Sequence, residues 1–158
     1  MISIYTDGAS RGNPGPGGYG AVMIYGTLRK ELSEGYRLTT NNRMELMSVI
    51  AALEALKKEG TAVTIYSDSK YVVDSVEKKW VFGWEKKNFK EKKNPDLWMR
   101  FLIVYRKHKI KFVWVKGHAS NKENNRCDEL AVAATQGGHL KIDSGYENEM
   151  KSAGVKLL

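Results

Sequence analysis

The spacing of apolar positions changes along this chain from the period of a strand to that of a helix. Near the N-terminus, three runs have the apolar and β-branched character of strands, over residues 2–7, 20–26 and 31–38. Between the first two lies GASRGNPGPGGYG, whose density of Gly and Pro predicts a loop. Three consecutive strands with short connections predict an antiparallel meander.

From Asn42 the apolar residues recur at helical spacing, and this first helix ends by Gly60. The elements predicted next are strand, helix, helix, strand and helix, over 62–67, 69–77, 96–107, 109–115 and 126–135. Hairpin strands followed by strands that alternate with helices predict an α/β fold, in which helices flank a single mixed sheet.

The length and composition fit one ordinary globular domain. The chain has 158 residues, 42% hydrophobic and 28% charged. No apolar run approaches the ~18 residues of a membrane span, and MISIYTDG has no basic leader, so we expect no membrane segment and no signal peptide. The single cysteine, Cys127, excludes an internal disulfide and suits a reducing, cytoplasmic location.

The charge is positive and unevenly distributed. There are 26 Lys and Arg against 18 Asp and Glu, a net charge of +8. Residues 78–93 hold seven Lys and two Glu, which is +5 of that total. An excess of this kind favours a polyanionic partner, but says nothing about the fold.

Two of the predicted strands end on an aspartate in the same phase. ISIYTDGAS places Asp7, and VTIYSDSKY places Asp68, two residues after a tyrosine. If the strands are neighbours, the two carboxylates lie side by side. The simpler interpretation is local, because Asp ends strands well and Asp68 stands where Asp and Ser cap a helix.

Three more residues have both a local and a functional interpretation. With Asn42 as N-cap, Glu45 occupies a capping-box position. Asp128 lies early in the last predicted helix, where an acid suits the helix dipole. His118 stands in a Gly-flanked loop, where a histidine is usually just solvated.

A mixed sheet brings Asp7, Glu45 and Asp68 toward one edge, which favours a shared role. Two unit charges ~4 Å apart repel by about 4 kcal/mol at an effective dielectric of 20. Such a cluster requires shifted pKa values or bound cations, and oxygen ligands select Mg²⁺ or Mn²⁺. Two ions ~3.5–4 Å apart can clamp a phosphodiester. An acidic cluster in a basic protein is therefore chemically consistent: the lysines would bind a polyanion, and the carboxylates would bind the metal ions that cut it.

Four long blocks, in order, resemble the signature blocks of ribonuclease HI: YTDGASRGNPGPGGYGA, TTNNRMELMSVIAALEAL, IYSDSKYVV and WVKGHASNKENNRCDELA. The resemblance covers residues 1 to about 146. It implies the ribonuclease H-like fold, with three antiparallel and two parallel strands in a five-stranded sheet. It also implies a domain over 1–146, a basic protrusion at about 78–95 and a C-terminal tail over 147–158.

The resemblance further implies a two-metal endoribonuclease. The metal-binding and catalytic carboxylates fall on Asp7, Glu45, Asp68 and Asp128, and the catalytic histidine on His118. The cofactor is then two Mg²⁺ ions, with Mn²⁺ as a substitute. The partner is an RNA/DNA hybrid whose RNA strand is cut to 3′-hydroxyl and 5′-phosphate ends. We expect a monomer without an obligate protein partner.

Substrate contacts are implied in the same way. The RNA strand meets Ser10, Asn13, Asn41 and Asn42, and Thr40 holds a DNA phosphate. Lys70 replaces the glutamine often found in the family and suggests a phosphate contact instead. In the protrusion the contacts fall on Trp80, Trp84, Lys86 and Lys87. Turn and capping chemistry, or a packed helix face with Trp80 and Trp84 four residues apart, is the simpler alternative.

Three other classes of protein remain open: a DNA nuclease of the integrase type, a hybrid-binding module with weak or no catalysis, and a domain of a reverse transcriptase. The presence of all four carboxylates and His118 argues against lost catalysis. The basic protrusion and the immediate start at Met1 favour a free-standing enzyme.

Overall fold

The computed structural model describes residues 1–116 and 121–154. In chain order, its elements are β1 (Ile2–Ser10), β2 (Gly15–Tyr25), β3 (Leu28–Thr39), α1 (Asn41–Glu54), β4 (Ala62–Ser67), α2 (Lys70–Glu77), α3 (Trp80–Lys86), α4 (Pro95–Tyr105), β5 (Lys109–Trp114), α5 (Lys122–Thr135) and α6 (Ser144–Ser152). None of these helices has the length and apolar character needed to cross a membrane.

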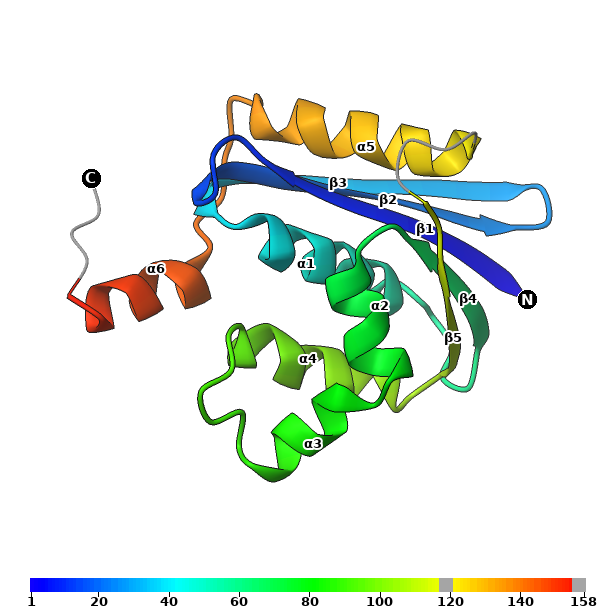
Figure 1. The fold of residues 1–158 in the computed structure, drawn as a ribbon. Coiled ribbons are helices and arrows are strands. Elements are labelled where there is room, and N and C mark those ends of the chain that lie inside the picture. The colour runs from blue at the N-terminus through cyan, green and yellow to red at the C-terminus, as the bar shows by residue number, and fades with distance from the viewer. Residues whose placement is uncertain (117–120, 155–158) are drawn as a thin grey trace.

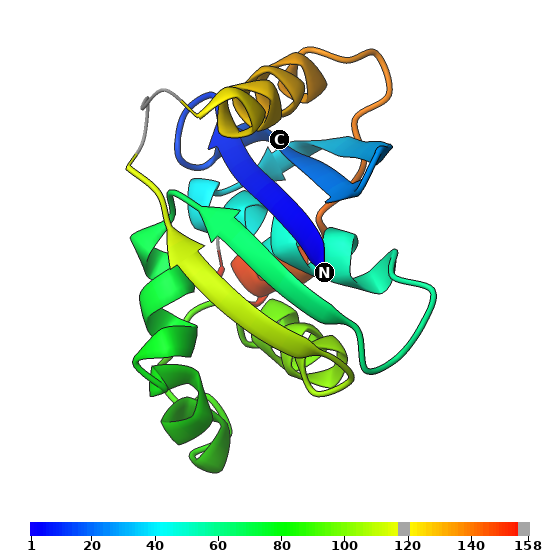
Figure 2. The same ribbon diagram turned by 90° about the vertical axis from the view of Figure 1, so that its right-hand side faces the viewer.

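One five-stranded sheet organises the molecule, in the order β3-β2-β1-β4-β5. β1, β2 and β3 pair antiparallel, whereas β1, β4 and β5 pair parallel. Helix α5 lies on one face of the sheet, and α1 to α4 lie on the other (Figure 1). Seen from the side, β5, β4 and β1 run next to one another in front of these helices (Figure 2). The mixed sheet and its composition of strands are therefore confirmed.

The glycine-rich segment is mostly strand, so the prediction of a loop over 8–20 was wrong. β1 continues to Ser10, β2 begins at Gly15, and the two pair along this stretch. A Cβ atom on Gly20 would overlap the carbonyl oxygen of Cys127 in α5. The glycines are thus a surface on which a helix packs, and their density does not mark a turn here.

The hydrophobic core fills the space between the sheet and α1, α2 and α4. Ile4 of β1, Ile50 of α1 and Phe101 of α4 are completely buried in it. Trp98 of α4 is also completely buried, and its indole N–H donates to the Tyr71 hydroxyl at 2.8 Å. The core therefore fixes α1 against the sheet, and this helix carries the predicted carboxylate Glu45.

The predicted tail, residues 147–158, begins inside a helix. α6 runs to Ser152, with Asp143 as its N-cap, so a boundary at residue 146 cuts the helix. Glu147 is buried and accepts two hydrogen bonds from Arg37 of β3, at 2.9 and 2.7 Å. Ion pairs hold α6, and because it has no apolar stripe the sequence pattern did not predict it.

A buried arginine joins three helices. Arg43 of α1 is 1% exposed. Its Nε and Nη2 donate to Asp143 at 2.7 and 2.8 Å, and its Nη1 and Nη2 donate to Asp96 at 2.9 and 2.7 Å. Asp143 caps α6 and Asp96 lies in the first turn of α4, so a single guanidinium connects α1, α4 and α6.

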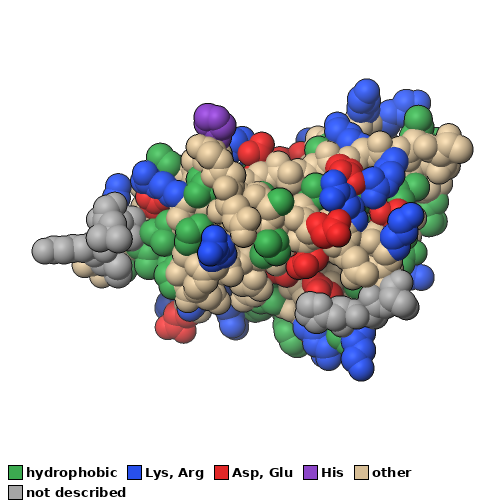
Figure 3. Space-filling view, turned by 90° about the horizontal axis from the view of Figure 1, so that it is seen from above, with side chains coloured by type: hydrophobic (Ala, Val, Ile, Leu, Met, Phe, Trp, Pro, Cys, Tyr) green, Lys and Arg blue, Asp and Glu red, His purple; other side chains and the backbone are tan. Residues whose placement is uncertain are grey.

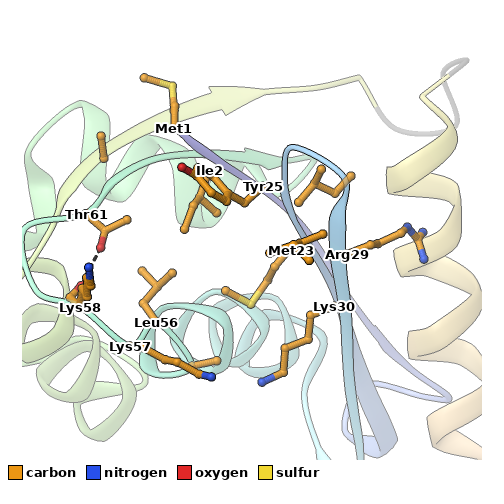
Figure 4. Close-up of a pocket in the computed structure, with 14 residues that line it drawn as sticks. Met1, Ile2, Met23, Tyr25, Arg29, Lys30, Leu56, Lys57, Lys58 and Thr61 are labelled. Carbon is orange, nitrogen blue, oxygen red and sulfur yellow. Dashed lines mark hydrogen bonds between the residues drawn. The ribbon is translucent and has the colours of Figure 1, made fainter.

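A groove of about 750 Å³ lies where the N-terminus, the β2–β3 hairpin and the end of α1 meet (Figure 4). Apolar side chains such as Met23, Tyr25 and Leu56 line it, and Lys30 and Lys57 stand at its rim. The described residues that line it include no Asp, Glu or His. The carboxylate chemistry predicted from the sequence must therefore lie elsewhere.

Replacing Arg43 tests the buried network. Arg43→Met leaves two carboxylates without their partner, and should lower the free energy of unfolding by about 3–5 kcal/mol. The matched control is Arg100→Met, because Arg100 makes a bidentate pair with Glu54 that is largely exposed. That change should cost less than about 1 kcal/mol. Urea unfolding measures both, and equal effects would contradict the role given to Arg43.

Candidate active site

The strands that carry the echoed sequences are neighbours, so the condition for placing Asp7 and Asp68 side by side is met. β1 and β4 pair parallel, with Tyr5 opposite Tyr66 and Thr6 opposite Ser67. The two tyrosine rings stack with centroids 4.7 Å apart. This register brings the next residues, Asp7 and Asp68, together where β4 ends and its pairing with β1 stops, although β1 itself continues to Ser10.

Glu45 reaches the same place from α1. The predicted capping box on Asn42 was wrong, because Thr40 is the N-cap and accepts from the backbone N–H of Arg43 at 3.2 Å. A Cβ atom on Gly8 would overlap the backbone nitrogen of Glu45. The glycine after Asp7 therefore admits the backbone of α1.

The three carboxylates form one cluster. Each of Asp7, Glu45 and Asp68 offers an oxygen within 4.8 Å of the oxygens of the other two. Asp7 and Glu45 are only 8% and 6% exposed. Buried acids held this close cannot all ionise without a compensating positive charge.

Raised pKa values at Asp7 and Glu45 reflect this unfavourable ionisation. Burial, followed by repulsion from Asp68, raises the pKa of Asp7 to about 8. Burial, followed by the charges of Asp7 and Asp68, raises the pKa of Glu45 well above its usual range. The Oε2 atom of Glu45 is buried without a hydrogen-bond partner. A divalent cation would supply both the charge and the missing partner, so the donor set fits a metal site.

Asp128 lines the same cleft from α5. The cleft has a volume of about 270 Å³, and its walls include all four predicted carboxylates. The charge of Asp128 contributes to the raised pKa of Asp7. Asp128 is the seventh residue of α5, whose N-cap is Asn121, so it lies beyond the first turn, where the dipole acts. The helix-dipole interpretation is therefore wrong for this residue.

The other predicted site residues are distributed around the cleft. Ser10 and Asn41 line it, and the Asn13 side chain accepts from the Asn41 backbone N–H at 3.1 Å. Thr40 caps α1, and Asn42 is exposed in the first turn. His118 lies outside the described residues.

Beside Asp68, the predicted contact residue Lys70 lies against Trp114, a residue that was not predicted from the sequence. The Lys70 ammonium lies 4.8 Å from the centroid of the Trp114 ring. The Trp114 indole N–H donates to the Asp68 carbonyl oxygen at 3.3 Å. Trp114 is the first residue of the WVKGHASNKENNRCDELA block. Its neighbours in the sequence predict a strand and give no sign of a functional role.

The basic protrusion contains a short helix, α3, and a groove of about 360 Å³. Trp84 packs edge-on against Trp98, with centroids 5.9 Å apart, whereas Trp80 is 48% exposed. Lys86 and Lys87 are exposed at the end of α3. The groove is lined by two tryptophans, a glycine and four lysines: Trp80, Trp84, Gly83, Lys79, Lys87, Lys90 and Lys92.

The α5 side of the molecule has a different charge character. There, basic and acidic side chains lie next to one another (Figure 3). Arg126 binds Glu31 through both Nε and Nη2, and Arg29 binds Glu31 and Glu123. Because these cations are paired with acids, the protrusion is the more favourable surface for a polyanion.

Comparison with known proteins agrees with this geometry. The RNase H family model matches residues 1–136. The ribonuclease H of Syntrophus aciditrophicus is 57% identical over 151 residues, spanning 92% of this chain and 87% of that protein. The ribonuclease HI of a Synechocystis strain is 54% identical over 151 residues, spanning 92% and 94%.

Solved structures give the same relationship at lower identity. LC9-RNase H1, a type 1 RNase H with the type 2 active-site motif, superimposes with a TM-score of 0.79 at 31% identity, over 99% of this chain and 86% of that one. LC11-RNase H1 in complex with an RNA/DNA hybrid gives 0.65 at 28% identity, over 86% and 97%. With the sequence, the fold and the clustered carboxylates in agreement, this chain belongs to the ribonuclease H family.

Proposed function

We propose that the protein is an endoribonuclease that hydrolyses the RNA strand of RNA/DNA hybrids and leaves 3′-hydroxyl and 5′-phosphate ends. The observation that carries this proposal is the cluster of Asp7, Glu45 and Asp68, with oxygens within 4.8 Å. Membership of the ribonuclease H family indicates the reaction class, and the carboxylate cluster supplies ligands for the divalent cations that the reaction needs.

Asp7, Glu45, Asp68 and Asp128 would hold the divalent cations. All their donors are oxygens, which favours Mg²⁺ and admits Mn²⁺. Bound there, the cations would activate a water molecule and stabilise the departing 3′ oxygen. His118 is the proposed proton-transfer residue.

The chain's own polar residues account for the choice of substrate. A 2′-hydroxyl distinguishes RNA from DNA and lies in the wide minor groove of an A-like duplex. Ser10 and Asn41 line the cleft and are short enough to reach it. We assign Asn13 and Asn42 to the same strand, Thr40 to a DNA phosphate, and Lys70 to a phosphate near the cut.

The protrusion supplies the second contact with the hybrid. Trp80 is exposed toward solvent where it can meet the DNA strand, and Lys86 and Lys87 are exposed for phosphates. Trp84 supports this surface from beneath through its contact with Trp98. A monomeric enzyme in the cytoplasm remains our prediction for the working form.

The decisive assay uses a hybrid with labelled RNA. With Mg²⁺ the wild-type protein should cut only the RNA, and EDTA should abolish cutting. Asp7→Asn should lower the rate by more than about 100-fold, because it removes a ligand from the cluster. Asp74→Asn is the control, since Asp74 does not line the cleft and pairs with Lys78 at 3.7 Å.

Two results would overturn the proposal. Digestion of plain duplex DNA would indicate a DNA nuclease of the integrase type. If wild type and Asp7→Asn bind the hybrid equally and neither cuts it, the protein is a hybrid-binding module.

The raised pKa of Asp7 predicts how the metal-free protein responds to pH. With a pKa of about 8 when folded and about 4 when unfolded, Asp7 holds its proton more tightly in the folded state. Stability should therefore fall as the pH rises from about 4 to about 8, by at most ~1.4 kcal/mol per pH unit for one proton. Urea unfolding in EDTA measures this. Asp7→Asn should reduce the dependence, leaving the contribution of Glu45, and a wild-type stability that rises over this range would contradict the prediction.

Salt dependence tests the protrusion. Replacing Lys86 and Lys87 together by Ala should reduce the slope of log affinity against log salt by about 0.9 for each phosphate that the protein no longer neutralises. The double change Lys57→Ala and Lys58→Ala removes the same charge from residues that line the separate apolar groove. This control should leave the slope unchanged. Equal reductions would mean that only net charge matters.

A further inference from the structure

Asn124 has an unusual environment in the cleft. It belongs to α5 and lines the cleft together with the four carboxylates. Both of its polar side-chain atoms, Oδ1 and Nδ2, are buried without a hydrogen-bond partner. Within residues 1–116 and 121–154, only five side-chain atoms are in this condition, and a third one of them, Oε2 of Glu45, belongs to the same cleft. Unsatisfied buried polar atoms are thus concentrated at the carboxylates.

As a purely structural residue, Asn124 is unfavourable. A buried amide with neither its donor nor its acceptor satisfied lowers stability, and asparagine is a poor helix former. It does not cap the helix, because Asn121 does so and accepts from the backbone N–H of Asn124 at 3.1 Å. We therefore expect the hydrogen-bond partner of its side chain to be a group that enters the cleft.

The chemistry of the amide restricts what that group is. Nδ2 donates, and the carboxylate and phosphate oxygens of the working site can accept from it. Oδ1 only accepts, and ionised carboxylates and phosphate diesters have no hydrogen to donate. A water molecule of a hydrated cation can donate, and Mg²⁺ usually keeps several of its waters.

The position of Asn124 agrees with this choice. It precedes Asp128 by four residues, about one helical turn, so both residues lie on the same side of α5. The two side chains therefore approach the carboxylates of β1, β4 and α1 from the same helix. Asn124 therefore borders the same cleft as Asp7 and Asp128, which would hold a cation.

We propose that Asn124 is a positioning residue of the metal site, whose amide holds a water molecule of the cation bound by the four carboxylates. This inference rests on the proposed function. It adds a fifth side chain to the four carboxylates of the metal site. It separates Asn124 from the neighbouring Asn125, which also borders the cleft but is exposed.

The test measures Mg²⁺ binding by isothermal titration calorimetry, in the absence of nucleic acid. Asn124→Leu keeps a similar volume and removes both polar atoms. It should weaken Mg²⁺ binding by about 10-fold or more, as loss of a hydrogen bond around a metal's ligands does. The metal-free variant should melt at the same temperature as wild type or higher. Asn124→Asp retains the acceptor and should bind Mg²⁺ at least as well as wild type.

Two control variants isolate the effect. Thr6→Val removes another buried, unpartnered polar atom, one that does not line the cleft, and should leave Mg²⁺ affinity unchanged. Asn125→Leu makes the same side-chain change on the adjacent, exposed position. It gives the gain in melting temperature that comes from helix propensity alone.

Three outcomes decide the matter. Wild-type Mg²⁺ affinity in Asn124→Leu would overturn the proposal, and a simultaneous loss of hybrid affinity would assign the amide to a substrate hydroxyl. A lower metal-free melting temperature in both Asn124→Leu and Asn124→Asp would show a structural role, and also overturn it. If Asp7→Asn binds Mg²⁺ as well as wild type does, the proposed function itself fails, which is a separate result.

Discussion

The close approach of two helices to the sheet is the constraint on which this structure depends. Gly8 admits the backbone of α1 at Glu45, and Gly20 admits the backbone of α5 at Cys127, next to Asp128. A side chain at either glycine would push Glu45 or Asp128 away from Asp7 and Asp68. Four acidic residues, from β1, α1, the β4–α2 connection and α5, converge because the sheet has no Cβ atoms at these two contacts.

This convergence is held against electrostatic repulsion. Burial and mutual charge raise the pKa values of Asp7 and Glu45, so the metal-free cluster is the unfavourable part of the fold. The favourable part lies on the same helix, α1, where Arg43 is locked by Asp96 and Asp143 two residues before Glu45. Rigid packing on one side of α1 lets the other side present an acid that a cation can bind.

The sequence predicted those features whose signal is local or repeated. The matching runs before Asp7 and Asp68 indicated a pair of carboxylates if their strands were neighbours, as they are, and the helical period predicted α1. It failed where tertiary contacts decide the outcome: the glycine-rich part of β1 and β2 resembled a turn, and Thr40 took the cap assigned to Asn42. α6 was missed because ion pairs hold it, and Asn124 because an unsatisfied amide is visible only in three dimensions.

The pairing of Arg43 with Asp143 also has a consequence for biosynthesis. The two residues are 100 positions apart, yet Asp143 supplies half of the carboxylate groups that surround this guanidinium. A nascent chain on the ribosome makes α1 early and must wait for α6 before the buried charge is fully compensated. The helix that carries Glu45 therefore reaches its final environment only after Asp143 and α6 have been synthesised.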